Sequence, residues 1–361
     1  MKKKVLVVDD MAIVRKLLTD LISEDPQLEV VGVAADGKIA LSKLGQLKPD
    51  IVILDVEMPE MNGLETVQNI RKIDARIPIV MFSAVTMSGA QVTLDALNSG
   101  ANDYVTKPEK MTSIDESKEY LRRSLISKIR TLTGLDQIIF AEVPKTVQPE
   151  RTPQAVLPPL SNRPIEIVGI GISTGGPNAL MTLFSGMPSR FSCPIVIVQH
   201  MPATFTKLFA DRLGTVTGLQ VKEAQDGDVL EPNTVWLAPG NYHMVLRREG
   251  FKTVIRLNQN PEENFCRPAV DPLFRSIADI YGGASLGVIM TGMGQDGLLG
   301  AEDIRRRGGQ IILQDESTSA VWGMPGACYR AGISNDVFPL EQLAFEISRR
   351  VEASNSRKVL N

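Results

Sequence analysis

Five residues with carboxylate, hydroxyl or ammonium side chains in the first third of the sequence have a spacing that suggests phosphate chemistry. Asp9 and Asp10 end one apolar run, Asp55 ends another, and Ser83 and Lys107 end two more. Converging carboxylates repel one another, and their oxygens favour a hard divalent cation such as Mg²⁺. We therefore expect Asp55 to accept a phosphoryl group whose oxygens contact Ser83 and Lys107. Any of these residues alone could be an ordinary exposed side chain, but the ordered set favours one shared site.

A serine on a glycine-flanked turn indicates a second kind of chemistry. Ser173 lies in the sequence Gly-Ile-Ser-Thr-Gly-Gly-Pro, directly after the apolar run Ile165–Ile170. Glycines allow a sharp turn that exposes a nucleophilic hydroxyl, and N–H groups at a following helix start would stabilise an oxyanion. Such a turn could instead serve only packing, or hold a dinucleotide phosphate. Gly169 and Gly171 begin a dinucleotide fingerprint, but Thr174 replaces its third glycine.

The partners that a nucleophilic serine needs are also present. The chain has only two histidines, and His200 directly follows the apolar run Pro194–Gln199, whereas His243 lies in a turn-rich segment. His200 is therefore the stronger candidate for the general base, although a structural, hydrogen-bonded histidine is the plain alternative. Asp296 follows the run Ser285–Met290 and could orient the imidazole; its alternative is an ordinary Asp-Gly turn.

Two backbone N–H groups are candidate oxyanion donors, and one further side chain is a candidate nucleophile. The N–H groups of Thr174 and Met293 are expected in the oxyanion hole, because both residues lie in glycine-rich turns near the serine or Asp296. Cys266 is an alternative nucleophile. It lacks a strand-to-helix turn, so we expect it to be a small buried residue.

The elements that would position the first site alternate along residues 1–108, as in a parallel sheet covered by helices on both faces. The expected strands are Lys4–Val8, Glu29–Val33, Ile51–Leu54, Ile77–Phe82 and Asp103–Val105. The expected helices are Met11–Ile22, Lys38–Leu47, Leu64–Ile73, Gln91–Asn98 and Met111–Leu132. Carboxyl ends of parallel strands meet at one edge, which would bring the acidic residues and the lysine together.

A second α/β domain, with a mainly parallel sheet, is expected after a proline-rich linker at 134–163. Its expected strands are Ile165–Ile170, Pro194–Gln199, Ser285–Met290 and Gln310–Leu313, with hairpins within Val221–Leu257. Its expected helices begin near Asn178 and cover Leu273–Tyr281, Leu298–Arg307 and Leu340–Val351. The serine, the histidine and Asp296 would then share one edge of the sheet.

The composition limits the function classes. The 361 residues are 43% hydrophobic and 22% charged, as in an ordinary globular protein. A net charge of −3 disfavours a nucleic-acid partner, because such proteins carry a basic excess. The three cysteines form no Cys-x-x-Cys pair, which argues against zinc or a disulfide framework. The apolar run Val5–Val8 ends at Asp9, so we expect no signal peptide, no membrane insertion and a cytoplasmic location.

The first part of the chain resembles a response regulator receiver domain. The resemblance lies in Val7–Asp10, Asp55–Gly63, Ser83-Ala84 and Tyr104–Pro108. It implies a five-stranded, flavodoxin-like, doubly wound fold with Asp55 as the phosphoacceptor. It also implies that Asp9, Asp10, Asp55 and the backbone carbonyl of Glu57 hold Mg²⁺. Tyr104 stands at the position of the family's switch aromatic, with Ser83 and Lys107 as the other switch residues.

The second part resembles the catalytic domain of the chemotaxis protein-glutamate methylesterases, the CheB family. The resemblance runs through the serine turn, Gln199–Pro202, Ala238–Gly240, Arg267–Asp271, Leu273–Ser276, Thr291–Gly297 and Gly323–Pro325. It implies a doubly wound serine ester hydrolase with the triad Ser173, His200 and Asp296 and no cofactor for the esterase step. The implied substrates are γ-glutamyl methyl esters on methyl-accepting chemoreceptors, with glutamine deamidation in some members. A chemosensory histidine kinase would supply the phosphoryl group.

The predicted organisation is a receiver at 1–109, a helix and linker at 110–164, a methylesterase domain at 165–352 and a tail at 353–361. Two rival functions stay open at this point. One is a receiver fused to a domain that only binds a partner. The other keeps the enzyme and assigns it to receptors of a surface-motility or developmental array.

Overall fold

Residues 2–108, 114–136 and 157–356 are described by the structure, which is a computed structural model. Two units divide the chain, one within residues 1–148 and the other within residues 149–361. The segment 137–156 of the predicted linker and residues 357–361 of the predicted tail lie outside the described residues.

The first unit is built on a parallel sheet with the strand order β2-β1-β3-β4-β5. This is the order of flavodoxin-like, doubly wound sheets, so the predicted fold class is confirmed. The strands are β1 Lys3–Val8, β2 Leu28–Ala34, β3 Ile51–Asp55, β4 Ile79–Ser83 and β5 Asp103–Thr106. Every residue of β3, β4 and β5 is buried, because helices cover both faces of a parallel sheet.

Local sequence sets the starts of three helices in this unit. The Asp36 side chain caps α2, Asn62 and Glu65 form a capping box at the start of α3, and Thr86 caps α4. Each such cap contributes about 1 kcal/mol. The caps fix the loops that leave the carboxyl ends of the strands, where the predicted phosphate site lies. The helices are α1 Ala12–Ser23, α2 Gly37–Leu47, α3 Gly63–Ile73 and α4 Met87–Asn98.

The predicted helix 111–132 is interrupted by a π turn. Its described parts are α5 Ile114–Leu121, the π turn Arg122–Ile126 and α6 Ser127–Leu132. Leu121, Leu125 and Ile129 are fully buried against the sheet at a spacing of four residues. An α-helix repeats every 3.6 residues, so the wider π turn keeps these three side chains on one face.

The second unit contains a seven-stranded parallel sheet with the order β14-β13-β12-β6-β7-β9-β8. The strands are β6 Ile167–Ile172, β7 Ile195–Gln199, β8 Gln220–Glu223, β9 Thr234–Leu237, β12 Ser285–Ile289, β13 Gln310–Gln314 and β14 Val337–Phe338. A separate antiparallel ribbon joins β10 His243–Glu249 to β11 Lys252–Asn258, within the segment where hairpins are predicted. The predicted α/β class with a mainly parallel sheet is confirmed.

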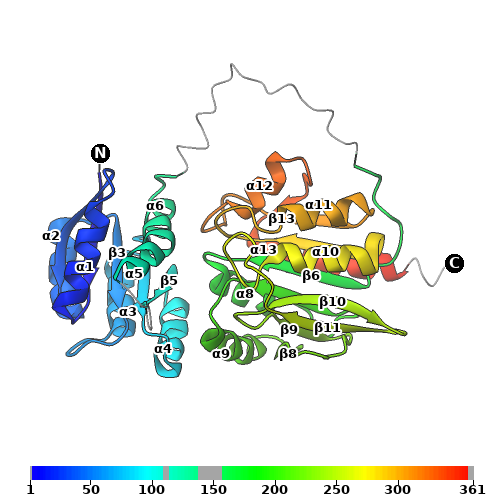
Figure 1. Cartoon of the computed structure of the whole chain (residues 1–361), viewed down its shortest axis with the longest axis horizontal. Coiled ribbons are helices and arrows are strands. Elements are labelled where there is room, and N and C mark those ends of the chain that lie inside the picture. The colour runs from blue at the N-terminus through cyan, green and yellow to red at the C-terminus, as the bar shows by residue number, and fades with distance from the viewer. Residues whose placement is uncertain (1, 109–113, 137–156, 357–361) are drawn as a thin grey trace, which may run out of the picture. The chain divides into compact units, whose positions relative to one another are not determined.

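Helices cover this sheet in two groups (Figure 1). The helix α8 packs on α9 and α13, whereas α10 packs on α11. The helices are α8 Gly176–Ser185, α9 Ala203–Gly214, α10 Val270–Tyr281, α11 Leu298–Arg306, α12 Met324–Arg330 and α13 Leu340–Ser356. The sequence analysis predicts neither α9 nor α12. Proline and glycine disfavour a helix in α12, which forms because it buries apolar side chains such as Met324, and α9 buries Phe205 and Phe209.

Glycines let α10 lie close to the sheet and to α11. A Cβ atom at Gly169 would lie 3.0 Å from the Phe274 ring, and one at Gly287 would lie 3.1 Å from it. At Gly300 in α11, a Cβ atom would lie 2.4 Å from the Cβ atom of Phe274 and 3.1 Å from the carbonyl of Asp271. These glycines therefore fix how closely α10 packs on β6 and β12.

Replacing Gly300 with alanine is expected to destabilise the second unit by about 1–3 kcal/mol, because α10 has to move away from α11. The free energy of unfolding can be followed by tryptophan fluorescence, since both tryptophans, Trp236 and Trp322, lie in this unit. Gly214→Ala is the control, because its Cβ atom would make only ordinary contacts, at 3.7 Å and beyond. Equal stability of the two variants would contradict the packing argument.

Candidate active site

Ser173 lies on a sharp turn between β6 and α8. The strand ends at Ile172, and Gly175 then adopts a left-handed conformation with φ +74° before the helix begins. The N–H of Gly176 donates to the carbonyl of Ser173 at 2.8 Å, which closes the turn. A Cβ atom at position 176 would lie 1.8 Å from Oε1 of Gln199, so this turn requires glycine. The predicted strand Ile165–Ile170 thus runs two residues further, directly to the serine.

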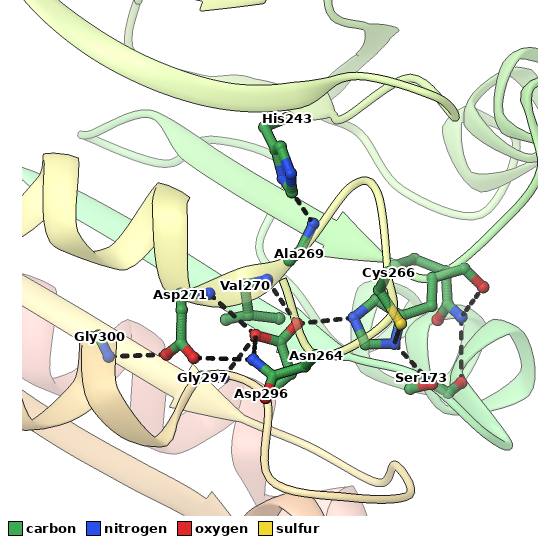
Figure 2. Close-up of polar contacts among 12 residues, drawn as sticks. Ser173, His243, Asn264, Cys266, Ala269, Val270, Asp271, Asp296, Gly297 and Gly300 are labelled. Carbon is green, nitrogen blue, oxygen red and sulfur yellow. Dashed lines mark hydrogen bonds and ion pairs between the residues drawn. The ribbon is translucent and has the colours of Figure 1, made fainter. Parts of the chain in front are cut away.

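His200 comes from the neighbouring strand and contacts the serine. It follows β7, and its Nδ1 atom lies 2.9 Å from Oγ of Ser173. Its Nε2 atom lies 2.8 Å from Oδ2 of Asp296, in the loop that follows β12 (Figure 2). The strands β12, β6 and β7 are adjacent in the sheet. The structure therefore brings together all three side chains that the sequence analysis assigns to the triad.

Asp296 is buried at the amino-terminal end of α10. One of its oxygens accepts a hydrogen bond from the N–H of Val270 at 2.6 Å, and the other accepts from the N–H of Asp271 at 3.1 Å. Burial alone raises the pKa of the Asp296 carboxyl, but the hydrogen bond from His200 and those from the backbone bring it below its usual value. Asp296 is therefore an anion that can hold the imidazole and stabilise its cation.

The surroundings strengthen His200 as a base. Burial lowers the pKa of its imidazole, but Cys266 and Asp296 raise it to about 10. The Asp296 carboxylate acts on the imidazole throughout the neutral range. A serine hydroxyl next to a base that is held by a buried carboxylate is the arrangement needed for acyl transfer.

The candidate oxyanion donors lie in two loops that meet at the serine. Thr174 is buried, and its carbonyl accepts a hydrogen bond from Oγ1 of Thr291 at 2.9 Å. A Cβ atom at Gly292 would lie 2.9 Å from that of Ser173, so the loop that carries Met293 passes close to the nucleophile. The N–H of Ser173 donates to the carbonyl of Thr291 at 3.0 Å and is therefore already used.

The second histidine has a different environment. His243 is 1% exposed, and its Nε2 atom lies 3.0 Å from the carbonyl of Pro261. Its Nδ1 atom accepts a hydrogen bond from the N–H of Ala269 at 3.3 Å (Figure 2). His243 thus joins two backbone segments beside the start of α10 rather than contacting the serine.

In the first unit, the predicted phosphate site is assembled at one edge of the sheet. Carboxylate oxygens of Asp9, Asp10 and Asp55 all lie within 4.8 Å of one another. The Lys107 ammonium lies 2.9 Å from Asp9 and 2.8 Å from Asp55. Burial raises the pKa of the Asp55 carboxyl to about 6, and the charge of Asp9 adds to this effect against the pull of Lys107.

One oxygen in this cluster fits a cation ligand. Oδ2 of Asp9 is buried, and the Lys107 ammonium lies 2.9 Å from it. A hard divalent cation with oxygen ligands suits three carboxylates that converge in this way. The residues present therefore fit the predicted magnesium site.

The other predicted residues of this site lie around it. The Ser83 hydroxyl is fully buried and accepts a hydrogen bond from Oγ1 of Thr93 at 2.7 Å. Tyr104 is 6% exposed, and Nζ of Lys128 lies 5.5 Å from its ring centroid. Glu57 is exposed in the loop that follows Asp55.

Comparison with known proteins places both units in families. The family profile described as CheB methylesterase matches residues 168–347, and the response regulator receiver domain profile matches residues 5–118. A "Protein-glutamate methylesterase/protein-glutamine glutaminase" of Trichodesmium erythraeum is 49% identical over 97% of this chain and 99% of its own length. The chain belongs to the CheB methylesterase family. A relative of the same name from Nocardioides sp. is 47% identical over 96% of this chain and 95% of its own length.

A solved structure agrees with the CheB assignment. The catalytic domain of the CheB methylesterase of Thermotoga maritima matches with a TM-score of 0.50 and 39% identity. The match covers 51% of this chain and 98% of that domain. Among the residues that the structure describes, no helix combines the length and the apolar character that crossing a membrane requires.

Sequence reasoning missed three residues beside Ser173, His200 and Asp296. The Gln199 amide donates to the carbonyl of Ser173 at 3.0 Å and to that of His200 at 3.3 Å, which ties the two turns together. The side-chain amide of Asn264 and the backbone N–H of Asp271 both donate to Oδ1 of Asp296. Asp271 lies within one of the motifs that carried the resemblance, but nothing in the sequence distinguished it from an ordinary helix-start acid.

The expectation for Cys266 as a small buried residue is wrong. Its side chain is half-buried, and its Sγ atom lies 3.4 Å from Nδ1 of His200, the nitrogen that also contacts Ser173 (Figure 2). The turn Asn264–Phe265 delivers the thiol to this place, because both residues have positive φ. Sequence spacing does not reveal such a turn without glycine.

Alkylation of Cys266 is therefore expected to reduce esterase activity by about a hundredfold, because the adduct would occupy space beside His200 Nδ1. Methanol release and peptide mass spectrometry before and after methylation of the thiol would test this. Cys193 and Cys328 serve as internal controls: both are buried, and burial raises the pKa of each thiol to about 12. Cys266→Ala is expected to lose the sensitivity to the reagent; inactivation of that variant at the same rate would contradict the prediction.

Proposed function

We propose that Ser173, His200 and Asp296 are the catalytic triad of a phosphorylation-activated protein-glutamate methylesterase. The observation that carries this proposal is the unbroken path from Oγ of Ser173 through both nitrogens of His200 to Oδ2 of Asp296. The enzyme hydrolyses γ-glutamyl methyl esters, a substrate class that agrees with the name protein-glutamate methylesterase of its relatives from Trichodesmium erythraeum and Nocardioides sp..

In the first half of the reaction, Oγ of Ser173 attacks the ester carbonyl while Nδ1 of His200 takes the hydroxyl proton. The tetrahedral oxyanion lies against the N–H groups of Thr174 and Met293. The C–O bond to the methoxy group then breaks, and His200 gives its proton to the departing methanol. The product is a glutamyl ester of Ser173.

In the second half, His200 takes a proton from water, and the resulting hydroxide attacks the glutamyl ester of Ser173. Collapse of the second oxyanion returns the proton to Oγ and releases the glutamate side chain. Asp296 stays ionised throughout and stabilises the imidazolium. A glutamine amide can follow the same steps with ammonia as the leaving group, which agrees with the second half of the relatives' names.

The receiver site regulates the reaction through Asp55, whose carboxylate we propose as the phosphoacceptor. Asp9, Asp10, Asp55 and the carbonyl of Glu57 would hold Mg²⁺. The bound cation supplies positive charge that offsets the carboxylates and the phosphoryl group. Lys107 would pair with a phosphoryl oxygen and Ser83 would donate to another, while Tyr104 would respond as the switch aromatic.

The partners follow from this chemistry. The substrate would be the cytoplasmic segment of a methyl-accepting chemoreceptor, and the phosphodonor a chemosensory histidine kinase in the cytoplasm. Neither nucleic acid nor insertion into a membrane is part of the proposed function.

Methanol release from a methylated receptor fragment tests the enzymatic assignment against the rival in which the domain only binds a partner. A serine-reactive fluorophosphonate is expected to label Ser173 and to stop methanol release in proportion to labelling. Labelling at another residue, or full activity of the labelled protein, would refute the triad.

A further inference from the structure

The amide of Asn264 lies between two buried carboxylates behind the triad (Figure 2). Its Nδ2 atom donates to Oδ2 of Asp271 at 3.0 Å and to Oδ1 of Asp296 at 3.0 Å. An amide nitrogen carries two protons and accepts none, so each carboxylate receives one of them. The donor capacity of this nitrogen is therefore fully used in joining the two acids.

Asp271 is buried and held by hydrogen bonds, as Asp296 is. Its side chain is 1% exposed, and its Oδ1 atom accepts a hydrogen bond from the N–H of Gly300 at 2.7 Å. Its own N–H donates to Oδ1 of Asp296, the same oxygen that Asn264 contacts. Asp271 and Asn264 thus hold Oδ1 of Asp296, whereas Oδ2 contacts His200 and accepts a hydrogen bond from the N–H of Val270.

A tight turn presents Asn264 to this site. Glu263 and Cys266 exchange backbone hydrogen bonds in both directions, at 3.2 and 2.9 Å. The two residues between them, Asn264 and Phe265, have φ of +53° and +61°, which is the conformation of a type I′ turn. Asparagine accepts a positive φ more readily than most residues, so this position suits the backbone and supplies the amide.

We propose that Asn264 and Asp271 are positioning residues of the esterase, which orient Asp296 toward Nε2 of His200 and place a second negative charge behind it. The inference rests on the triad of the proposed function and extends it by two residues. Without the amide, two buried carboxylates would face each other directly, and Asp296 could turn away from the imidazole.

Several charged or titratable groups surround Asp271. Asp296 lies across the amide with His200 beyond it, Arg275 lies on the same helix, and Cys328 lies on α12. Burial raises the pKa of Asp271 to about 6; the charge of Asp296 adds to this, and Gly300, Asn264 and Arg275 oppose it. Asp271 is therefore ionised at neutral pH, and its negative charge favours the protonated imidazole of His200.

The sign of the expected pH effect follows directly. A negative charge near an imidazole raises its pKa, so removal of the Asp271 charge lowers the pKa of His200. The serine reaction needs a neutral imidazole. The acidic limb of the pH profile of kcat is therefore expected to move to lower pH in Asp271→Asn, although kcat itself falls.

The test compares Asn264→Gly and Asp271→Asn in the full chain. Asn264→Gly keeps the positive φ and deletes only the amide, and Asp271→Asn keeps the size of the side chain and deletes the charge. Each is expected to lower kcat for methanol release by about tenfold to a hundredfold, the range for one hydrogen bond to a charged group, with KM little changed. The double variant is expected to lose no more kcat than the more damaging of the two single variants, because both changes act through Asp296.

Asn233→Gly is the matched control. Asn233 also has a positive φ, of +63°, but its side chain accepts a hydrogen bond from the N–H of Phe191, in a part of the unit that does not touch the triad. It is expected to keep wild-type kcat. Tryptophan fluorescence would establish that all variants are folded.

The outcomes separate this inference from the proposed function. If wild type labels at Ser173 and releases methanol, but both variants keep its kcat and its acidic limb, the positioning role is wrong and the triad stands. The same holds if the losses in kcat multiply in the double variant. If Ser173→Ala retains wild-type activity, the proposed triad itself fails.

Discussion

Replacing Ser173 with alanine is expected to reduce methanol release from methylated receptor fragments by about 10⁴-fold to 10⁶-fold. The variant keeps the turn, because Gly175 and Gly176 set its backbone. It removes Oγ, which lies 2.9 Å from Nδ1 of His200 and can form an ester with the substrate. Substrate affinity should change little, since the oxyanion donors and the backbone of the site remain.

The matched control for this experiment is Ser185→Ala, at the other end of α8. The hydroxyl of Ser185 donates to the carbonyl of Thr182 within the helix, away from the triad. This variant is expected to keep wild-type methanol release and fluorophosphonate labelling. Substantial turnover by Ser173→Ala that is lost when Cys266→Ala is added would identify Cys266 as the nucleophile instead, because its thiol contacts the same nitrogen.

The positions of the triad were predictable because they depend on topology. Ser173, His200 and Asp296 each follow an apolar run, and parallel strands bring such positions to one edge. The strand order could not be read from the sequence. That β12, β6 and β7 are neighbours follows from long-range pairing, in which β12 enters the sheet beside a strand more than a hundred residues earlier.

The supporting residues could not be predicted, because they depend on loop conformation. Asn264 reaches the two carboxylates only through a type I′ turn that contains no glycine, and Cys266 reaches His200 through the same turn. The sequence predicts Gln199 as the last residue of a strand, and it does not predict that the Gln199 amide donates to the carbonyl of Ser173 in the neighbouring turn. The helix α12 was not predicted for a related reason. It forms through burial of Met324 and Cys328, although proline and glycine disfavour a helix there.

Asp55→Asn is expected to abolish the stimulation of methanol release by acetyl phosphate and Mg²⁺, and to leave the unstimulated rate close to that of wild type. An amide oxygen is too weak a nucleophile to take a phosphoryl group, whereas the Asp55 carboxylate can form an acyl phosphate. The substitution keeps the size of the side chain beside Lys107, so the sheet and the loop of α3 should remain folded.

The control for this experiment is Asp20→Asn, an exposed position on α1 that is expected to keep full stimulation. Radiolabelled acetyl phosphate should transfer its phosphoryl group to wild type and to this control but not to Asp55→Asn. Stimulation that survives in Asp55→Asn, together with labelling of another acid, would move the phosphoacceptor to Asp9 or Asp10. Loss of labelling without loss of stimulation would show instead that the donor acts on the esterase without the receiver site. Only joint loss of labelling and stimulation would connect the acidic cluster of the first unit with Ser173 in the second unit, because nothing else in the assay depends on Asp55.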